Sequence, residues 1–328
     1  MRASKAGFTL LELLVATAVF VIILMIGITV LGQASNTWRR SAENAGAFQS
    51  ARTGFDLITR NLSQATLNTF VDYVDAGNRF PGEAGYDNAP VRYARQSDLH
   101  FVCAQAGASG TPGTAGTGSA VFFEFPQGQT NKVSQYGGLD GTLNACGYYV
   151  EFGADSGQPA HVQGAPKYRY RLKELLVPTE ENAIFKASTA GSNKWFADFA
   201  STRSYPVAEN IIALILRPED PADPSLLAGS YTYDSRLNTH LDPQPLAANQ
   251  MPPVVQVTMI AIDEPSAQRL ADGATPPAVI VSALKGRLQE PAQLETDLTL
   301  ITKDLAEARI NYRVFSTAIP IRESKWTK

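Results

Sequence analysis

The sequence predicts an α+β protein in which one long helix precedes a head built mostly from antiparallel strands. The chain has 328 residues and begins with an apolar stretch that leads, without a proline, into an amphipathic one. Short segments rich in aromatic and β-branched residues follow, and they are grouped rather than alternating with helices, which favours an antiparallel sheet. The net charge of −3 argues against nucleic-acid binding, which needs a concentrated basic face.

The first element is an apolar helix long enough to cross a membrane. Residues 13–31 are 19 consecutive positions without a charge. About 20 apolar residues, rising about 1.5 Å each, span a hydrocarbon core of about 30 Å, so we predict a transmembrane helix over 8–31. Glu12 is an acid inside this apolar block. A charge there costs roughly 2.5–3.5 kcal/mol on insertion scales, so it needs a partner.

The residues before the apolar block are short, basic and free of acids. A secretory signal places its small-residue cleavage site after the apolar region, whereas Gly7 precedes it. The segment Lys5-Ala6-Gly7-Phe8-Thr9-Leu10-Leu11-Glu12-Leu13 resembles the N-terminus of type IV prepilins and secretion-system pseudopilins. The resemblance implies that a prepilin peptidase cleaves after Gly7 and methylates Phe8. Residues 1–7 are then a leader peptide, and the mature chain keeps its apolar helix.

The same resemblance implies an assembly role for Glu12, which falls at the fifth mature position. It implies that this carboxylate pairs with the N-terminal ammonium of a neighbouring subunit. Such pairing makes a buried charge tolerable and would fix the axial register between subunits. The alternative is a plain single-pass anchor whose glutamate lies close enough to the interface to be hydrated.

Beyond residue 31 we predict that the helix continues as an amphipathic stalk over 32–68. Residues 33–67 contain no proline, and apolar residues return at spacings of three and four, which places them on one helical face. Several glycines leave open an alternative, in which a linker separates a membrane helix from a surface helix. The predicted stripe consists of Ala45, Phe48, Ala51, Phe55, Ile58, Leu62 and Ala65.

Two further resemblances refine the class. Residues 48–65 look like the corresponding helix of minor, J-type pseudopilins. Segments along nearly the whole chain resemble the Verru_Chthon cassette protein C family of large prepilin-like proteins, found in Verrucomicrobia. The resemblance implies a pilin-like fold with the long helix packed on the sheet. It implies no particular biochemical function, because that family has no established activity. The matching segments include Thr37-Trp38-Arg39-Arg40, Ser97-Asp98-Leu99-His100-Phe101, Gly147-Tyr148-Tyr149-Val150-Glu151-Phe152 and Pro252-Pro253-Val254-Val255-Gln256-Val257-Thr258-Met259.

Residues 69–328 are predicted to form a globular, extracytoplasmic α+β head. Residues 75–90 and 106–119, rich in glycine and other turn formers, are predicted to be loops, the second of them a flexible surface loop. Alternation and aromatic content predict the strands, and apolar spacing predicts the helices. The strands are expected at 98–104, 121–125, 147–152, 168–172, 211–216, 254–262 and 310–321, and the helices at 265–271, 278–288 and 291–308.

Cys103 and Cys146 are the only cysteines. Because the head is placed in an oxidising compartment, where disulfides persist, one interpretation is a bridge between them. The other is two separate buried thiols. The sequence leaves both open, because a bridge depends on a Cα separation that the sequence does not give.

No catalytic constellation is visible, so we do not expect an enzyme. The three histidines, at 100, 161 and 240, lack metal-ligand spacing, and no nucleophile elbow occurs. No cofactor is expected. Glu219, Asp220 and Asp223 crowd a proline-containing loop but do not follow an EF-hand pattern. We interpret them as a solvated acidic turn, with calcium binding as the alternative.

Together these features predict a type IV pilin-like (pseudopilin-like) minor or specialised subunit of a pilus-like or type II secretion-like structure. Its expected partners are the prepilin peptidase, other pilin-like subunits and the inner membrane, with no nucleic acid. It would cross the inner membrane once with its head outside the cytoplasm, or enter a periplasmic or surface filament. The alternative is an anchored adhesive or binding head that recognises a surface, a polymer or exported cargo.

Overall fold

The computed structural model describes residues 10, 14–15, 17–29, 31, 48–139, 141–154, 166–186, 192–223, 226–227, 229–271 and 273–327. Gly7, Phe8, Glu12 and the stretch 32–47 therefore lie outside the described residues. The chain divides into two compact units, Met1–Gln49 and Ser50–Lys328.

The described part of the first unit is helical over 17–29. Its apolar side chains are exposed all round the helix, for example Phe20 at 60% and Met25 at 72%. Its threonine hydroxyls are satisfied within the helix: Thr29 Oγ1 donates to the carbonyl oxygen of Met25 at 2.8 Å. Among the described residues, no helix is both long and apolar enough to cross a membrane. The transmembrane helix over 8–31 stays a prediction.

The second unit begins with helix α2 (Gln49–Leu62), whose predicted apolar positions Ala51, Phe55, Ile58 and Leu62 are all buried. The helix lies close to the strands because Gly54 has no side chain. A Cβ there would meet the Cβ of Ala208 at 2.9 Å and Leu172 Cδ2 at 3.1 Å. The ring of Phe55 packs on that of Phe315, with centroids 5.6 Å apart. The sheet surface that the amphipathic pattern requires is therefore present.

The larger sheet has six strands in the order β7-β6-β5-β4-β3-β9, and every neighbouring pair is antiparallel. Its central strand β4 is buried along nearly its whole length, because both faces of the sheet are covered. The strands are β3 (Val102–Gln105), β4 (Ser119–Pro126), β5 (Leu143–Ala154), β6 (Tyr168–Val177), β7 (Ser204–Glu209) and β9 (Tyr233–Asp234).

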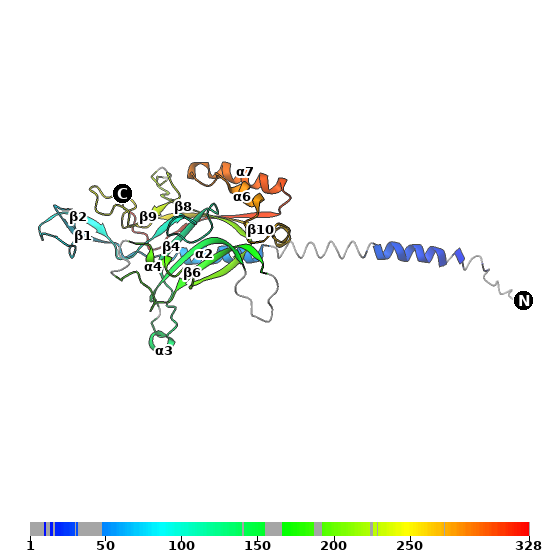
Figure 1. Cartoon of the computed structure of the whole chain (residues 1–328), viewed down its shortest axis with the longest axis horizontal. Helices are drawn as coiled ribbons and strands as arrows, with labels where there is room; N and C mark the ends of the chain where they lie inside the picture. The colour runs from blue at the N-terminus through cyan, green and yellow to red at the C-terminus, as the bar shows by residue number, and fades with distance from the viewer. Residues whose placement is uncertain are drawn as a thin grey trace, which may run out of the picture. The chain divides into compact units, whose positions relative to one another are not determined.

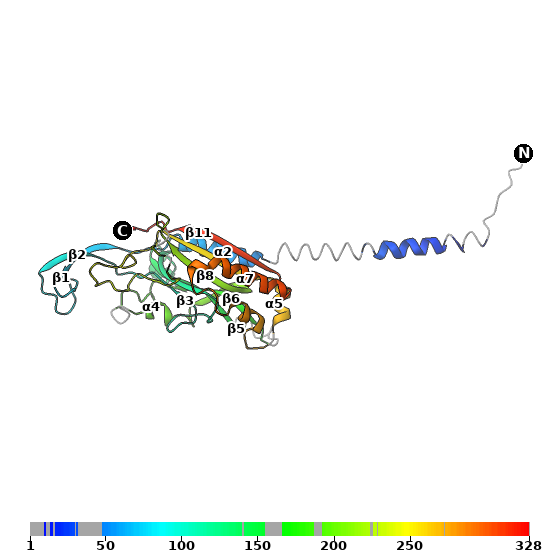
Figure 2. The ribbon, with the colours of Figure 1, turned by 90° about the horizontal axis from the view of Figure 1, so that it is seen from above.

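A second sheet has three antiparallel strands in the order β11-β10-β8. Helices α6 and α7 lie on one side of it, and α2 lies on the other (Figures 1 and 2). The elements are β8 (Ile211–Glu219), β10 (Val254–Ile262), β11 (Tyr312–Pro320), α5 (Glu264–Leu270), α6 (Ala278–Leu284) and α7 (Leu294–Glu307), the last preceded by a 3-10 turn over Pro291–Gln293.

Strands β1 (Phe70–Asp75) and β2 (Pro90–Gln96) form an antiparallel hairpin that projects from the rest of the second unit (Figures 1 and 2). A small core of Val74, Phe80 and Ala94 supports its tip. The predicted loop over 75–90 forms most of that tip. Two short helices complete the described elements, α3 (Val133–Tyr136) and α4 (Lys194–Ala197).

The predicted surface loop over 106–119 is confirmed as far as Gly118, with exposed residues at 107–110 and 115–116, and β4 begins at Ser119. The loop is fixed to β5: the backbone N–H of Thr114 donates to the carbonyl of Val150 at 2.9 Å, and the Thr114 hydroxyl accepts from the backbone N–H of Phe152 at 2.8 Å. Gly118 then passes against β8, where a Cβ would lie 2.2 Å from the Leu214 carbonyl oxygen. Its glycines permit tight turns and this close approach, rather than disorder.

The disulfide interpretation is also not supported, because Cys103 and Cys146 are buried free thiols. Cys103 on β3 is paired with Val121 of β4, and Cys146 on β5 is paired with Phe123 of the same strand. Strand β4 therefore separates them. Neighbouring strands lie about 4.7–4.9 Å apart, so two such spacings exceed the Cα separation of about 7 Å that a bridge tolerates.

Candidate functional site

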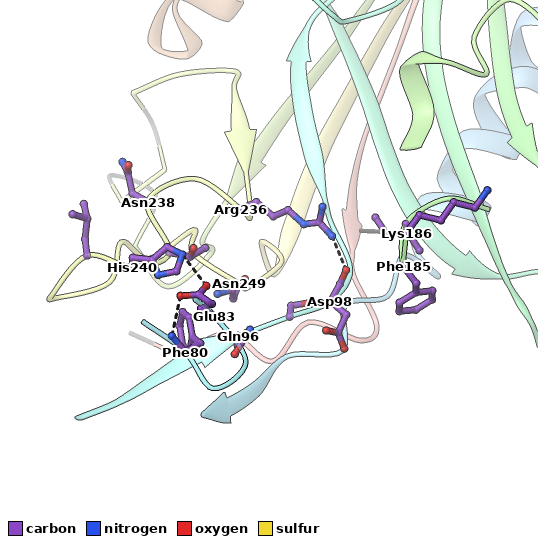
Figure 3. Close-up of a pocket in the computed structure, with 14 residues that line it drawn as sticks. Phe80, Glu83, Gln96, Asp98, Phe185, Lys186, Arg236, Asn238, His240 and Asn249 are labelled. Atoms are coloured by element: carbon purple, nitrogen blue, oxygen red, sulfur yellow. Dashed lines mark hydrogen bonds and ion pairs between the residues drawn. The ribbon is translucent and has the colours of Figure 1, made fainter. Parts of the chain in front are cut away.

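The head contains a cavity of about 700 Å³, within the range of about 300–1,000 Å³ typical of small-molecule sites. It lies between the hairpin and the loop that follows β9 (Figure 3). Its lining comes from separate stretches of sequence: the hairpin tip, the end of β2, the turn after β6 and the loop after β9. The lining residues include Phe80, Glu83, Gln96, Asp98, Phe185, Lys186, Arg236, Asn238, Thr239 and His240.

A buried hydrogen-bonded chain positions the loop after β9. The Trp195 indole donates to Nδ1 of His100 at 3.0 Å; an indole only donates, so Nδ1 accepts and the proton of the neutral ring is on Nε2. Nε2 lies 2.7 Å from Asp234 Oδ1, which also accepts from the backbone N–H of Arg236 at 2.8 Å. His100 is therefore a structural residue that fixes the start of the lining loop.

The electrostatics of this chain agree with that role. Burial lowers the pKa of His100 and outweighs the opposing hydrogen bond and charge of Asp234. Burial acts to raise the pKa of Asp234, but the hydrogen bond and charge of His100, helped by Arg236, bring it below its ordinary value. A neutral imidazole beside a carboxylate is thus held in one orientation.

The same loop is tied to β2 farther along. The Gln244 side chain makes two hydrogen bonds with the backbone of Arg95: Oε1 accepts from the N–H at 2.7 Å, and Nε2 donates to the carbonyl at 2.9 Å. Asn249 Nδ2 donates to the same carbonyl at 2.6 Å. The two walls of the cavity therefore belong to one hydrogen-bonded unit.

The turn after β6 is held by a buried acid. Glu124 on β4 is 0% exposed, and its Oε2 accepts from Asn182 Nδ2 at 2.7 Å. Asn182 Oδ1 in turn accepts from the backbone N–H of Ile184 at 3.1 Å, which leaves the next side chain, Phe185, 65% exposed. Burial raises the pKa of Glu124 to about 8, against the smaller opposing effects of Asn182 and Arg236.

Polar groups face one another across the cavity. Figure 3 shows His240, Glu83 and Phe80 on one side and Asp98 and Phe185 on the other. His240 Nδ1 lies 2.9 Å from the carbonyl oxygen of Asn78, which can only accept, so Nδ1 carries a proton. Nε2 of the same ring lies 3.6 Å from Glu83 Oε1. The cavity therefore presents a mixture of acidic, basic and amide groups.

The interpretation of a solvated acidic turn is wrong for Asp220, which is 2% exposed and uses both carboxylate oxygens within the chain. Asp220 Oδ2 accepts from the Trp326 indole at 3.0 Å, and its Oδ1 accepts from the backbone N–H of Ala222 at 2.9 Å. Glu219 pairs with Arg217 at 2.8 Å. Within the described ranges, no three His, Cys, Asp or Glu side chains are placed to hold a metal ion.

The structure leaves the processing and assembly positions untested. Gly7, Phe8 and Glu12, together with His161, lie outside the described residues, so their roles stay predictions. Sequence reasoning did not find the cavity. The sequence contains one indirect sign of it. Two strand-like segments flank residues 76–89, which indicates the hairpin that forms one wall.

Comparisons with known proteins bear on the N-terminus alone. Residues 2–28 match the prokaryotic N-terminal methylation motif. No curated protein and no solved structure matched the chain. The matched range includes Gly7, Phe8 and Glu12, and the match confirms the coarser prediction, a type IV pilin-like N-terminus of the kind that prepilin peptidase processes.

Proposed function

We propose that this chain is a pseudopilin-like minor or specialised subunit, not an enzyme, that assembles into a pilus-like or type II secretion-like structure. Cleavage after Gly7 leaves Phe8 as the methylated N-terminus, and Glu12 pairs with the terminal ammonium of a neighbouring subunit. The observation that carries this proposal is the N-terminal methylation motif at residues 2–28. Within the class, we place it with the large prepilin-like proteins of the Verru_Chthon cassette protein C family of Verrucomicrobia.

The proposed organisation is a leader over 1–7, a transmembrane helix over 8–31, a stalk over 32–68 and an extracytoplasmic head over 69–328. Two observations support it. The helix over 17–29 exposes apolar side chains on every side, which suits lipid or neighbouring helices better than water. Helix α2 buries its stripe on an antiparallel sheet, as a pilin-like helix would. The subunit then sits in the inner membrane or in a periplasmic or surface filament.

Assembly is tested with Glu12→Val in cells that express an epitope-tagged chain. We expect normal cleavage after Gly7 and about a tenfold loss of immunogold signal on filaments. The reason is that the N-terminal ammonium of the neighbouring subunit loses its carboxylate partner inside the membrane. Thr17→Val is the matched control: it also removes a polar group from the apolar helix, but one whose hydroxyl donates to the Leu14 carbonyl of its own helix at 2.9 Å. Unchanged filament labelling with Glu12→Val would contradict the assembly role.

A second candidate function is an adhesive or binding head that recognises a surface, a polymer or exported cargo. The observation that favours it is the cavity of about 700 Å³, which a purely structural subunit does not need. Immunogold labelling separates the two roles. Label along the shaft favours a structural subunit, and label confined to the tip favours a recognition subunit. Diffuse membrane label that is unaffected by loss of the prepilin peptidase would contradict both.

A further inference from the structure

We propose that the cavity between the hairpin and the loop after β9 binds a neutral saccharide, such as one unit of a surface polysaccharide. The inference deepens the second candidate function and rests on the head being a binding module. It does not depend on how the N-terminal helix assembles.

The charges around the cavity favour an uncharged ligand. Two acids, Glu83 and Asp98, two cationic side chains, Lys186 and Arg236, and the imidazole of His240, which lies beside Glu83, line it. Arg236 Nη2 already donates to the backbone carbonyl of Asp98 at 2.6 Å, and Figure 3 shows Lys186 extending away from the other labelled side chains. An anion would meet two carboxylates and a cation would meet two bases, so neither is electrostatically favoured.

The neutral polar groups point to hydroxyls. Gln96, Asn238 and Thr239 line the cavity, and amides and hydroxyls each offer both donors and acceptors. A sugar hydroxyl also donates and accepts, so it pairs with either kind of group. A lipid or other apolar ligand would leave these groups desolvated and unpaired, which disfavours its binding.

Two lining side chains already carry unmet hydrogen-bonding capacity. Gln96 Oε1 and Arg236 Nη1 are shielded from water and have no hydrogen-bond partner among the described residues. One is an acceptor and the other a donor, and a hydroxyl satisfies both kinds. Gln96 is only partly buried, and the terminal torsion of its amide is soft. A small rotation of this amide therefore turns Oε1 toward a ligand, whereas the Arg236 guanidinium is held by its bond to the Asp98 carbonyl.

An aromatic ring stands at the rim. Phe185 is 65% exposed, and its turn is held by Asn182, which is itself anchored to buried Glu124. A pyranose ring has an apolar face of C–H groups that packs on an aromatic ring and removes apolar surface from water. An exposed ring on this held turn, beside a cavity lined by both polar and apolar side chains, thus matches both faces of a sugar.

The test uses the full-length processed chain in detergent, applied to an array of neutral and anionic glycans. We expect binding to at least one neutral glycan and weaker binding to anionic ones such as alginate. Phe185→Ala and Gln96→Ala should each weaken that binding about tenfold or more. Tyr93→Ala is the matched control, since Tyr93 is an exposed aromatic residue (70%) on the hairpin that does not line the cavity. It should leave binding unchanged.

Three results would overturn the inference: no binding to any neutral glycan by folded wild-type protein, preferential binding to anionic glycans, or binding that survives both cavity variants. Circular dichroism melting of each variant checks the fold, which truncation of an exposed ring should not disturb. The N-terminal mass of the same preparation tests pilin-like processing independently. Failure of one proposal is therefore distinguishable from failure of the other.

Discussion

The side-chain amide of Asn61 on α2 donates a hydrogen bond to the hydroxyl of Tyr148 on β5, with Nδ2 and OH 2.8 Å apart. That hydroxyl in turn donates to Glu174 Oε1 on β6. Asn61 is 4% exposed and Tyr148 is completely buried. The amphipathic helix is therefore fixed to two strands by a polar network as well as by its apolar stripe.

Asn61→Ala should destabilise the head by about 1–3 kcal/mol. The Tyr148 hydroxyl and the Glu174 carboxyl each lose a hydrogen-bond donor in the interior. The free energy of unfolding, measured by urea denaturation, checks this. Gln64→Ala serves as the control near the same end of the helix, because Gln64 Nε2 donates to a carbonyl of that same helix, that of Arg60, at 3.2 Å. Equal stability of the two variants would contradict the proposed anchoring.

Gly118→Ala should destabilise the chain far more than Gly116→Ala. Both glycines have positive φ, +97° and +85°, but a Cβ at Gly118 would lie 2.2 Å from the Leu214 carbonyl oxygen, whereas nothing lies within 4 Å at Gly116. Gly116→Ala should cost only the backbone strain, about 1–2 kcal/mol. The difference in melting temperature between the two variants measures the effect of the close approach of the chain at Gly118 to β8. Similar melting temperatures would show that the two strands do not approach so closely.

The contribution of Glu124 to stability should fall as the pH rises. Burial raises the pKa of this carboxyl from 4.5 to about 8 in the folded chain. The folded state therefore holds a proton that the unfolded state has lost between these pH values. This contribution to stability is complete below pH about 4.5 and is lost as the pH rises to about 8.

Glu124→Gln should remove that part of the pH dependence, since an amide does not ionise and its oxygen still accepts from Asn182. We expect the variant to lose less stability than the wild type between pH 5 and pH 8, as measured by urea denaturation at each pH. Glu174, whose pKa burial also raises, is present in both proteins and contributes equally. Parallel pH profiles would contradict the account of Glu124.

The two thiols should be unreactive in the folded protein. Cys103 and Cys146 are buried, and burial raises the pKa of both above the ordinary value, so little reactive thiolate is present. Iodoacetamide labelling followed by mass spectrometry should find no modification in native conditions and two modified cysteines after unfolding without a reductant. A peptide pair linked through Cys103 and Cys146 would contradict the strand register.

Much of the head could be predicted where a local pattern decides the structure. The 3- and 4-residue spacing of Phe55, Ile58 and Leu62 gave a buried helix face, and the apolar run 254–262 coincides with β10. The hairpin β1–β2 and strand β7 were missed. Val71, Tyr73 and Tyr93 are exposed, as is Tyr205 on β7, so these strands lack the apolar face that burial imposes on a sequence.

Long-range features could not be read from local sequence. The separation of Cys103 and Cys146 depends on β4 lying between their strands, which a loop length does not reveal. The cavity joins residues as far apart as Phe80 and His240, and none of them belongs to a recognisable motif. Glycines 113 and 118, read as signs of flexibility, instead pack against β5 and β8. Pairing of distant strands decides all three features.

Processing of the N-terminus decides whether the chain is a type IV pilin-like subunit. It is tested by intact mass and N-terminal sequencing of the protein extracted from membranes. We expect a chain that begins at Phe8 with a methylated amino group and lacks residues 1–7. A native chain that retains Met1 to Gly7, or begins after the apolar stretch, would contradict it.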